Sequence, residues 1–453
     1  MRLLVAAWLC CGAAAAAPAA APLAPRQHLK ERREQPHLVG GGKSGKQGKL
    51  KVLVLMSDTG GGHRASANAL TQALQRLCPG EFDVTLFDVW TAVSGWPWDR
   101  AVPAYRVLGK RPWLWRLLWY GTAMWPGRVL NRWFHDVQLR GRFIKAMARF
   151  EPDMVVSVHP MCQHVPLSAL GAMARRRGDE RVPFATIVTD LGSAHPNWFD
   201  KRADAVFVPS ARVERVARFH GVPREKIILH GLPLRAAFCD AAKHSSRRAD
   251  RAKARRRARA KLGLAQDRPV VLVAGGGDGF GGVAQIVGAT ADALAKKGLP
   301  AQLVAVCGHN AQLAAEILAV DWCQCAPGVD VKVTGFLENM HTFMAASDVL
   351  LTKAGPGTIA EAAALGLPVV LTSFLPGQER GNVHHVVEGG FGALAQRPAA
   401  AGRAVAAWLE QPAALEAMAD AARLTAKPLA TASIAADIAA LAKRHSRRSS
   451  PRR

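Results

Sequence analysis

Acidic residues are few in this sequence. There are 34 Asp and Glu against 60 Lys and Arg, so the formal net charge is +26 at pH 7. Such an excess indicates an anionic partner: a nucleic acid, an acidic membrane surface or a phosphorylated substrate. No segment resembles an RRM, KH or helix-turn-helix signature, so we do not expect the partner to be a nucleic acid.

Cysteine is also sparse, with eight residues in a chain of 453. No two of them have the CxxC spacing of a zinc finger or a redox site, and eight are too few for a disulfide scaffold. The nearest pair after the N-terminal segment is Cys323 and Cys325, and no second ligand pair accompanies it. We therefore expect reduced thiols and no metal site.

Long apolar runs are missing after the N-terminal segment, so we expect no membrane span. Residues 1–49 are instead typical of a targeting presequence and linker. An Ala- and Pro-rich stretch at 3–25 precedes a basic segment at 26–33 and a Gly/Lys linker at 40–48. This order fits the two-part presequence used to enter complex plastids of algae, and an organelle transit peptide is the alternative.

Strand-like and helical segments alternate from residue 50 onward. Short Val-, Ile- and Leu-rich runs separated by helical patterns indicate parallel, doubly wound sheets. A break in the pattern divides them into an α/β domain at 50–240 and a second one at 265–430. Residues 241–264 are predicted to be a basic linker, and residues 431–453 the end of a C-terminal helix and a basic tail.

Two segments concentrate the positive charge. Residues 243–261 hold ten Lys or Arg and one Asp. They are expected to form a solvated basic helix between the domains, or else a contact with acidic lipid. Residues 443–453 hold six basic and no acidic residues, and disorder is expected there.

Tryptophan is concentrated in one segment. Eight of the twelve tryptophans lie between positions 90 and 133, interleaved with Lys and Arg. Tryptophan favours the membrane–water boundary and basic residues favour acidic headgroups, so the segment predicts interfacial membrane binding. The alternative is that these rings fill a core.

A glycine–histidine turn carries the first candidate site. Residues 60–62 are glycines between a strand-like run at 51–56 and a helical pattern at 65–77. Free N–H groups at a helix N-terminus suit an anion or a developing negative charge. His63 beside them is a candidate base because its pKa can lie near the working pH. The alternative is a histidine that only caps the helix.

Three further glycine loops follow strand-like runs in the second domain, at 275–279, 335–336 and 353–361. Ligands of open parallel sheets collect at the carboxyl ends of strands. The helix that begins near Thr358 would direct its N-terminus at a phosphate, and Glu361, one turn on, could hold both hydroxyls of a ribose. None of the loops is a Walker A motif or a GxGxxG fingerprint. Together they predict a nucleotide-diphosphate site, with ordinary αβ turns as the alternative.

The motifs taken together resemble the monogalactosyldiacylglycerol synthase family of plastid galactolipid enzymes. More weakly, they are similar to the bacterial lipid-linked GlcNAc transferase of peptidoglycan synthesis. The resemblance extends over about residues 50–430 and rests on these segments: 58–66, 157–160, 189–191, 195–196, 231–235, 353–361 and 377–382. It implies a GT-B fold, in which two Rossmann-like domains face each other across a cleft. It also implies an inverting transfer of galactose from UDP-galactose to diacylglycerol at the plastid envelope, by a peripheral membrane protein.

The resemblance assigns roles residue by residue. His63 is the catalytic base, acting directly or through the phosphate of an acidic activator lipid. The acceptor or acidic-lipid side comprises Gly61, Gly62, His63, Trp96, Pro97, Trp98, His159 and His195. The UDP-sugar side comprises Arg235, Gly276, Gly277, Asp278, Gly308, Phe336, Gly355, Pro356, Gly357, Thr358, Glu361, Gln378, Glu379 and Asn382.

Within the donor set, Gly308 and Phe336 are assigned to the uracil, Glu361 to the ribose, and Gln378 with Glu379 to the galactose hydroxyls. Arg235 and a helix N-terminus can balance the charge of the leaving diphosphate, and no DxD-like motif lies in a suitable loop, so neither metal nor cofactor is expected. Asp58 and Asp190 are candidate partners for His63. Structural His-Pro turns are the alternative for His159 and His195. A transferase with another donor or acceptor, or an inactive lipid- or nucleotide-sugar-binding homologue, stays open.

Overall fold

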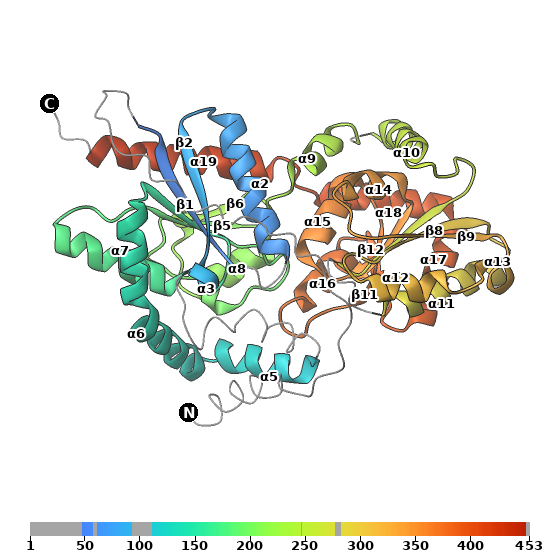
Figure 1. The fold of residues 1–453 in the computed structure, drawn as a ribbon, viewed down its shortest axis with the longest axis horizontal. Helices are drawn as coiled ribbons and strands as arrows, with labels where there is room; N and C mark the ends of the chain where they lie inside the picture. The colour runs from blue at the N-terminus through green and yellow to red at the C-terminus, as the bar shows by residue number, and fades with distance from the viewer. Residues whose placement is uncertain (1–47, 58–60, 93–110, 246, 277–281, 450–453) are drawn as a thin grey trace, which may run out of the picture.

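The computed structural model describes residues 48–57, 61–92, 111–245, 247–276 and 282–449. They form two α/β domains, each with a six-stranded parallel sheet flanked by helices (Figure 1). The strand order is β2-β1-β3-β4-β5-β6 in the first sheet and β12-β11-β10-β7-β8-β9 in the second. In both, the chain turns back beside the first strand of the domain, as in a doubly wound fold. The predicted α/β class with two doubly wound domains is confirmed.

Strands and helices alternate along the chain of the first domain. Its strands are β1 (Leu50–Met56), β2 (Phe82–Asp88), β3 (Met154–Ser157), β4 (Phe184–Ile187), β5 (Ala205–Val208) and β6 (Ile227–Leu229). Its helices are α2 (Gly61–Leu77), α3 (Val89–Ala92), α5 (Pro112–Ala123), α6 (Trp125–Phe150), α7 (His164–Arg177) and α8 (Ala211–Phe219), with 3-10 turns η2 (Pro196–Trp198) and η3 (Arg224–Lys226).

The second domain begins after the α9 helix (Ala236–Lys243). Its strands are β7 (Val270–Ala274), β8 (Ala301–Val306), β9 (Val329–Thr334), β10 (Val349–Lys353), β11 (Val369–Ser373) and β12 (Gly392–Leu394). Its helices are α10 (Arg248–Leu262), α11 (Val283–Lys296), α12 (Ala311–Leu318), α13 (Trp322–Cys325), α14 (Met340–Ala346), α15 (Pro356–Leu365), α16 (Arg380–Glu388), α17 (Pro398–Leu409) and α18 (Pro412–Thr425). The last helix is α19 (Ala430–Ser449).

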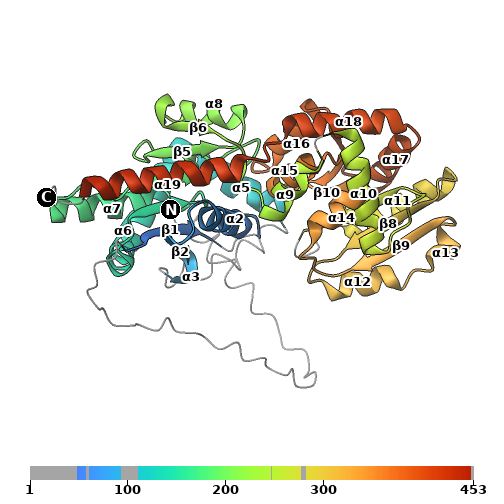
Figure 2. The same ribbon diagram turned by 90° about the horizontal axis from the view of Figure 1, so that it is seen from above.

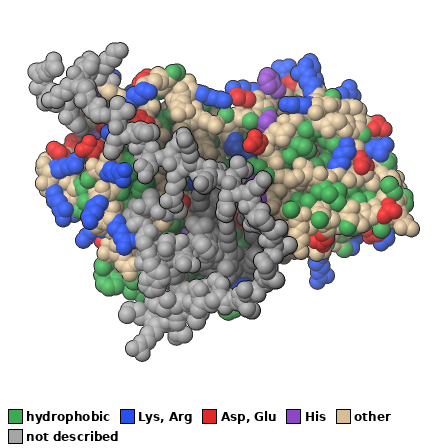
Figure 3. Space-filling view, in the orientation of Figure 1, with side chains coloured by type: hydrophobic (Ala, Val, Ile, Leu, Met, Phe, Trp, Pro, Cys, Tyr) green, Lys and Arg blue, Asp and Glu red, His purple; other side chains and the backbone are tan. Residues whose placement is uncertain are grey.

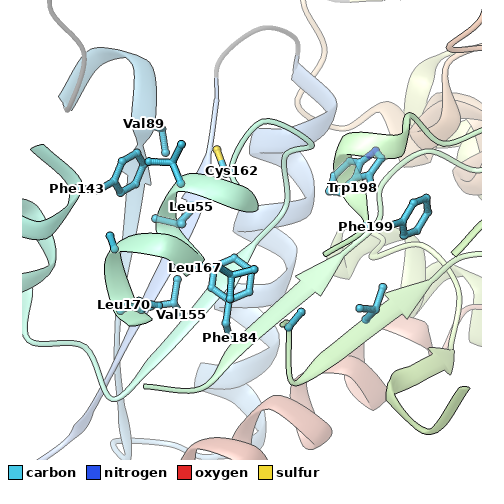
Figure 4. Packing of buried hydrophobic residues seen from close by; sticks show 14 of the residues in the cluster. Leu55, Val89, Phe143, Val155, Cys162, Leu167, Leu170, Phe184, Trp198 and Phe199 are labelled. Carbon is cyan, nitrogen blue, oxygen red and sulfur yellow. The ribbon is translucent and has the colours of Figure 1, made fainter. Parts of the chain in front are cut away.

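The central strands are apolar on both faces because helices cover both faces of each sheet. In β1, Leu53 and Leu55 join the core beneath α6 and α7, whereas Val52, Val54 and Met56 join the core on the opposite face. Figure 4 shows the first of these clusters, in which Phe143 of α6 and Leu167 of α7 lie against the sheet. The alternation expected of a half-exposed strand is therefore absent from β1.

The basic segment at 243–261 contains the expected helix, α10, which has an exposed side and a buried side. Its helix α10 packs against α14, and its Arg251 and Arg259 are each 6% exposed. Arg259 Nη2 donates to Asp348 Oδ2 at 2.6 Å, and Arg251 Nη2 donates to Glu416 Oε2 at 3.1 Å. Neither expectation for this segment included this buried side. Its guanidinium groups are paired with carboxylates, as buried charges require, and face neither water nor lipid. Lys and Arg side chains remain on the outside of α10 (Figure 3).

The C-terminal helix returns to the first domain. As Figure 2 shows, α19 runs along that domain, and it packs against α2 and β1. Its buried side chains are Ile434, Ala435, Ile438, Ala439 and Ala442. The disorder expected from residue 443 is wrong as far as Ser449, which ends the helix.

One helical stretch, Pro412–Arg447, is long and apolar enough to cross a membrane by length and composition alone. It contains α18 and α19, and Ala426 between them has an extended backbone. The apolar face of α19 lies in the core of the first domain, which accounts for its composition.

Candidate functional site

The two domains meet through segments that follow strands β4 and β11. We call them the β4–η2 segment (residues 188–195) and the β11–α16 segment (residues 374–382). Gly192 N donates to Asn382 Oδ1 at 2.8 Å, and Asn382 Nδ2 donates to Ala354 O at 2.8 Å. A Cβ on Gly192 would lie 2.7 Å from Asn382 N and would overlap the carbonyl of Gly381. Only glycine at 192 and 381 permits this backbone contact between the carboxyl ends of the two sheets.

His63 lies in the first turn of α2, facing β3 and β4. Its Nδ1 is 2.8 Å from Val158 O and 3.1 Å from Thr189 Oγ1. Because a carbonyl oxygen only accepts, Nδ1 must carry the proton, and Nε2 keeps its lone pair. Burial lowers the pKa of His63 to about 4, against a smaller opposing effect of the bond to Val158. The ring is therefore neutral at pH 7 and able to accept a proton at Nε2.

Gly61 and Gly62 form the start of the same helix. A Cβ on either would meet no atom within 4 Å, so neither glycine is required by close packing of the described residues. Both are exposed, which leaves the positive end of α2 accessible next to His63. This geometry agrees with an anion beside the ring.

His159 stands directly beside His63. The two rings are 4.6 Å apart in an edge arrangement, and His159 Nδ1 accepts from Met161 N at 3.3 Å. Burial and the neighbouring His63 hold the pKa of His159 well below its usual value. The structure thus brings together these two predicted residues of the acceptor side.

His195 contacts helix α5. Its Nδ1 accepts from Asn197 N at 3.1 Å, and its Nε2 lies 3.2 Å from Thr122 Oγ1 of α5. Burial lowers its pKa to about 4. Both ring nitrogens of His195 are therefore engaged, one of them by α5, and its role on the acceptor side stays a prediction beside the alternative of a structural His-Pro turn.

Asp190 does not pair with His63, contrary to the prediction. Its Oδ2 accepts from Trp198 Nε1 at 2.7 Å, and the Gln378 side chain of the second domain also bonds to it. Burial raises the pKa of Asp190 to about 7, with these hydrogen bonds opposing the rise and the nearby Glu379 adding to it. Asp190 is therefore a link between the domains.

The N-terminus of α15 carries the residues predicted to contact the phosphates, Gly355–Thr358. Gly355 is the N-cap, Pro356 opens the helix, and no described side chain caps it. A Cβ on Gly357 would meet no atom within 4 Å, so the backbone is approachable there. Uncapped N–H groups at a helix start suit the oxygens of a diphosphate, with Thr358 in the same turn.

Glu361 and Arg235 are brought together as predicted, but they bind each other. Arg235 Nε donates to Oε1 of Glu361 at 2.7 Å, and Nη2 donates to Oε2 at 2.8 Å. Burial raises the pKa of Glu361, and Arg235 opposes that rise. A ribose bound here must share the remaining lone pairs of Glu361 or displace Arg235 from it.

The residues predicted to read the sugar lie in the β11–α16 segment. Glu379 is 4% exposed; it accepts from Lys353 Nζ at 3.0 Å and from Leu375 N at 2.9 Å. Gln378 has a buried Oε1 without a hydrogen-bond partner among the described residues, so this acceptor is available to a hydroxyl. Both ends of the Asn382 amide are paired with backbone groups: Oδ1 accepts from Gly192 N of the first domain, and Nδ2 donates to Ala354 O within the second domain.

An aromatic platform lies at the carboxyl ends of β8 and β9. Phe336 is 56% exposed and stacks on His309, with ring centroids 4.4 Å apart and planes 11° apart. Gly308, which precedes His309, has a φ of 60° that sets the turn. A flat, exposed pair of rings suits a nucleobase. Sequence reasoning missed His309, although its place directly after a strand-end glycine was a usable signal.

Of the remaining predicted site residues, one is described by the structure and the others are not. Gly276 lies two residues after the end of β7 and has a φ of 78°. Asp58, Trp96, Pro97, Trp98, Gly277 and Asp278 lie outside the described residues. Among the described residues, no three His, Cys, Asp or Glu side chains are grouped to hold a metal ion. A hollow of about 430 Å³ between α11, α12 and α13 lies at the far end of the second domain (Figure 1) and holds none of the predicted site residues.

The tryptophan-rich segment divides into a buried and an exposed side. Trp90 and Trp115 are buried, as a core would require. The other side is what we call the α5–α6 apolar face. It comprises Trp113, Leu117, Tyr120, Met124, Trp125, Val129, Leu130, Trp133 and Val137, all of which are exposed. The prediction of a surface rich in tryptophan therefore holds for part of the segment, and the core alternative holds for the rest.

Two family models match this chain. The one described as monogalactosyldiacylglycerol (MGDG) synthase matches residues 63–234, and the glycosyltransferase family 28 C-terminal domain matches residues 270–393. "Monogalactosyldiacylglycerol synthase 1, chloroplastic" of Arabidopsis thaliana is 36% identical over 393 residues, which cover 86% of this chain and 70% of the relative. "Monogalactosyldiacylglycerol synthase 2, chloroplastic" of the same plant is 35% identical over 400 residues, with coverage of 85% and 80%.

Solved structures share the architecture at low identity. MurG of Acinetobacter baumannii has a TM-score of 0.55 at 18% identity, covering 86% of this chain and 99% of that one. A UDP-GlcNAc 2-epimerase from Neisseria meningitidis, bound to UDP-GlcNAc, has a TM-score of 0.52 at 16% identity, with coverage of 86% and 100%. These likenesses confirm the predicted GT-B arrangement of the two domains.

Proposed function

Because the chain belongs to the monogalactosyldiacylglycerol synthase family of glycosyltransferases, we propose that it transfers galactose from UDP-galactose to the free hydroxyl of 1,2-diacylglycerol with inversion. The product is monogalactosyldiacylglycerol. The observation that carries the proposal is the tautomer of His63, whose Nδ1 proton is fixed by Val158 O and whose Nε2 lone pair is left as a base.

In the transfer, the acceptor hydroxyl oxygen attacks the anomeric carbon while the bond from that carbon to the diphosphate oxygen breaks. The hydroxyl proton passes to His63 Nε2, and UDP leaves with the electron pair. A general base beside the acceptor contributes most when its pKa approaches the working pH. An acidic lipid phosphate at the start of α2 would raise the pKa of His63 from about 4 toward that range.

The donor is held by the second domain. The uracil stacks on the Phe336–His309 platform, and the diphosphate lies at the N-terminus of α15, where N–H groups stabilise the leaving charge without a cofactor. Arg235 and Glu361 serve the ribose and phosphate side, and Gln378 with Glu379 the galactose. Gly276 lies at the end of β7 beside this group, and Gly277 and Asp278 remain predicted phosphate contacts.

The acceptor reaches the site from a lipid surface. The α5–α6 apolar face carries exposed Trp113, Trp125 and Trp133, and helices α5 and α6 have seven basic residues against one acidic residue, Asp136. Exposed tryptophans beside excess positive charge suit an acidic bilayer. We infer peripheral binding to an anionic plastid envelope membrane, in line with the chloroplastic relatives. Trp96, Pro97 and Trp98 remain predicted lipid contacts.

The test is a donor and acceptor assay. Purified protein is mixed with vesicles of phosphatidylglycerol, phosphatidylcholine and diacylglycerol, then with radiolabelled UDP-galactose, UDP-glucose or UDP-GlcNAc, and lipids are separated by thin-layer chromatography. We expect a labelled galactolipid from UDP-galactose only, with a β linkage by NMR. A glucolipid or a GlcNAc-lipid instead would refute the donor assignment, and no labelled lipid at all would favour an inactive homologue.

The His63→Ala variant tests the base. We expect its turnover to fall by about 10²–10⁴-fold, the usual contribution of a general base, while UDP binding measured by calorimetry stays within about twofold. Turnover near that of the wild type would remove His63 from the mechanism. Loss of UDP binding would show that the variant has damaged the fold, and the base assignment would then have no support.

A further inference from the structure

Helix α5 has two faces with different surroundings. Trp113, Leu117 and Tyr120 are exposed and belong to the α5–α6 apolar face. The opposite side contacts the site: Thr122 Oγ1 lies 3.2 Å from His195 Nε2, and the Trp119 ring centroid lies 4.7 Å from that of His195. One short helix therefore joins a candidate lipid surface to the segment that follows β4.

Trp119 also touches the second domain. Its indole lies against Gly377 of the β11–α16 segment, and a Cβ on Gly377 would be 2.6 Å from Trp119 Nε1. Gly377 has a φ of 82°, which L side chains rarely adopt. The glycine thus serves two needs at once, a left-handed turn and room for the indole.

The segment that Trp119 contacts carries the donor-side groups. Gln378 and Glu379 follow Gly377 directly, and Ser193 Oγ donates to the carbonyls of Gly377 and Gln378 at 3.1 and 2.7 Å. A displacement of Gly377 would therefore move the side chains proposed to read the sugar. Figure 1 shows α5 lying beneath the junction of the two domains, near α16.

We propose that Trp119 is a positioning residue that couples docking of the α5–α6 apolar face on an acidic bilayer to the donor site, by holding Gly377 in place. The proposal rests on the proposed function for the identity of the donor. A bilayer that restrains α5 holds the indole against Gly377 and orders the β11–α16 segment. Asn382 of that segment donates to Ala354 O, directly before the N-cap of α15, so the UDP part of the donor is then bound more tightly. By linkage, bound donor strengthens bilayer binding by the same factor.

The surface is assigned to an acidic bilayer by charge and continuity. Helices α5 and α6 contain Arg116, Arg128, Arg132, Arg140, Arg142, Lys145 and Arg149. Their single acidic residue is Asp136, which pairs with Arg140 at 3.1 Å. Helix α6 begins two residues after α5 ends, and its Trp125 and Trp133 are exposed as well.

The experiment measures the Kd for UDP by calorimetry, with and without saturating phosphatidylglycerol–phosphatidylcholine vesicles that lack diacylglycerol. For the wild type we expect vesicles to lower the Kd by about fivefold or more, the lower end of typical allosteric coupling. In Trp119→Ala the ratio should fall below about twofold, whereas Trp119→Phe keeps a ring and most of the ratio. The matched control is Trp408→Ala, another partly buried tryptophan that lies in the second domain.

A double-mutant cycle isolates the ring contact. Gly377→Ala introduces backbone strain in any background, but it collides with the indole only when Trp119 is present. We expect Gly377→Ala to weaken UDP binding at least about threefold more in the wild type than in Trp119→Ala. Equal effects in the two backgrounds would show that the contact carries no coupling.

The outcomes separate this proposal from the proposed function. Three results would each overturn the coupling. The first is a wild type whose Kd for UDP does not change with vesicles, and the second is a Trp119→Ala variant that sediments with vesicles and keeps the wild-type ratio of Kd values. The third is a Trp408→Ala variant that loses as much of this ratio as Trp119→Ala. Vesicle-coupled UDP binding without galactose transfer to diacylglycerol would refute the substrates and leave the coupling intact. A wild type that binds no UDP under any condition would overturn both.

Discussion

Asn382 offers the most direct measure of how the two domains are held together. Its side chain is 1% exposed, and both ends of the amide pair with backbone groups, Gly192 N in the first domain and Ala354 O in the second. In Asn382→Ala both groups lose their partner inside the protein. Each buried unpaired group costs about 1–3 kcal/mol, so we expect the two together to lower the free energy of unfolding by about 2–6 kcal/mol.

Asn382→Asp tests the same two hydrogen bonds, and its effect on the free energy of unfolding should depend on pH. The new carboxylate still accepts from Gly192 N, but its second oxygen faces Ala354 O, which is also an acceptor. Only the protonated acid can donate to that carbonyl, so the buried carboxyl should have a raised pKa in the folded state. Its stabilising form is then present at low pH and is lost as pH rises through the folded pKa.

The assay is urea unfolding followed by tryptophan fluorescence at pH 5 and pH 8, with galactose transfer measured in parallel. Asn310→Ala is the matched control, because Asn310 Oδ1 accepts one bond from Leu313 N at the start of α12, within the second domain. That cap is worth about 1 kcal/mol. The reasoning fails if Asn382→Ala costs no more than the control, or if Asn382→Asp is as stable at pH 8 as at pH 5.

Two further predictions follow from the ion pair and from the exposed rings. Arg235→Ala leaves the buried Glu361 carboxylate without its partner, so its already raised pKa rises further. Stability should fall by about 1–3 kcal/mol at pH 8 and recover as pH drops, and Glu361→Gln added to it should remove the pH dependence of the urea midpoint. Replacing Trp125 and Trp133 by Ala should weaken binding to acidic vesicles, measured by sedimentation, by tenfold or more, which corresponds to a loss of about 1.4 kcal/mol of binding free energy for the pair. The Kd for UDP measured without vesicles should not change. Unchanged sedimentation would show that the α5–α6 apolar face does not bind the bilayer.

The local features of the site were predictable because they depend on short stretches of chain. The continuous apolar run of β1, the glycines before His63 and the Gly-Pro-Gly start of α15 each specify their own geometry within a few residues. Strand ends of a parallel sheet then bring such motifs to one edge without further information. For this reason the sequence alone predicts that His63 and His159 lie at the same edge of the first sheet, whereas Arg235 and Glu361 were grouped on the UDP-sugar side by the family resemblance.

Partners chosen across long separations could not be predicted in this way. The ten basic residues at 243–261 are typical of a solvated segment. The sequence of this segment does not indicate that α10 forms ion pairs with Asp348 and Glu416, which lie far away along the chain. The sequence also gives no sign that α19 would cover the first domain. Asn382 was placed on the UDP-sugar side because its motif is shared with the family, and the motif gives no sign of the hydrogen bond that it accepts from Gly192 of the first domain.

The junction and the proposed catalytic groups occupy the same two segments, and this has a consequence for function. Asp190 accepts from Gln378 across the domains, and Ser193 holds the carbonyls that precede Glu379, so the donor-reading side chains are placed partly by the first domain. Separation of the two domains would break these hydrogen bonds together, and the side chains of the proposed donor site would no longer be held in place. A complete site therefore exists only when the acceptor domain is docked, which ties donor binding to the domain that carries His63 and the α5–α6 apolar face. In the proposed function, this arrangement would disfavour hydrolysis of the sugar nucleotide away from the lipid surface, because the proposed base and sugar-reading groups come together in one step.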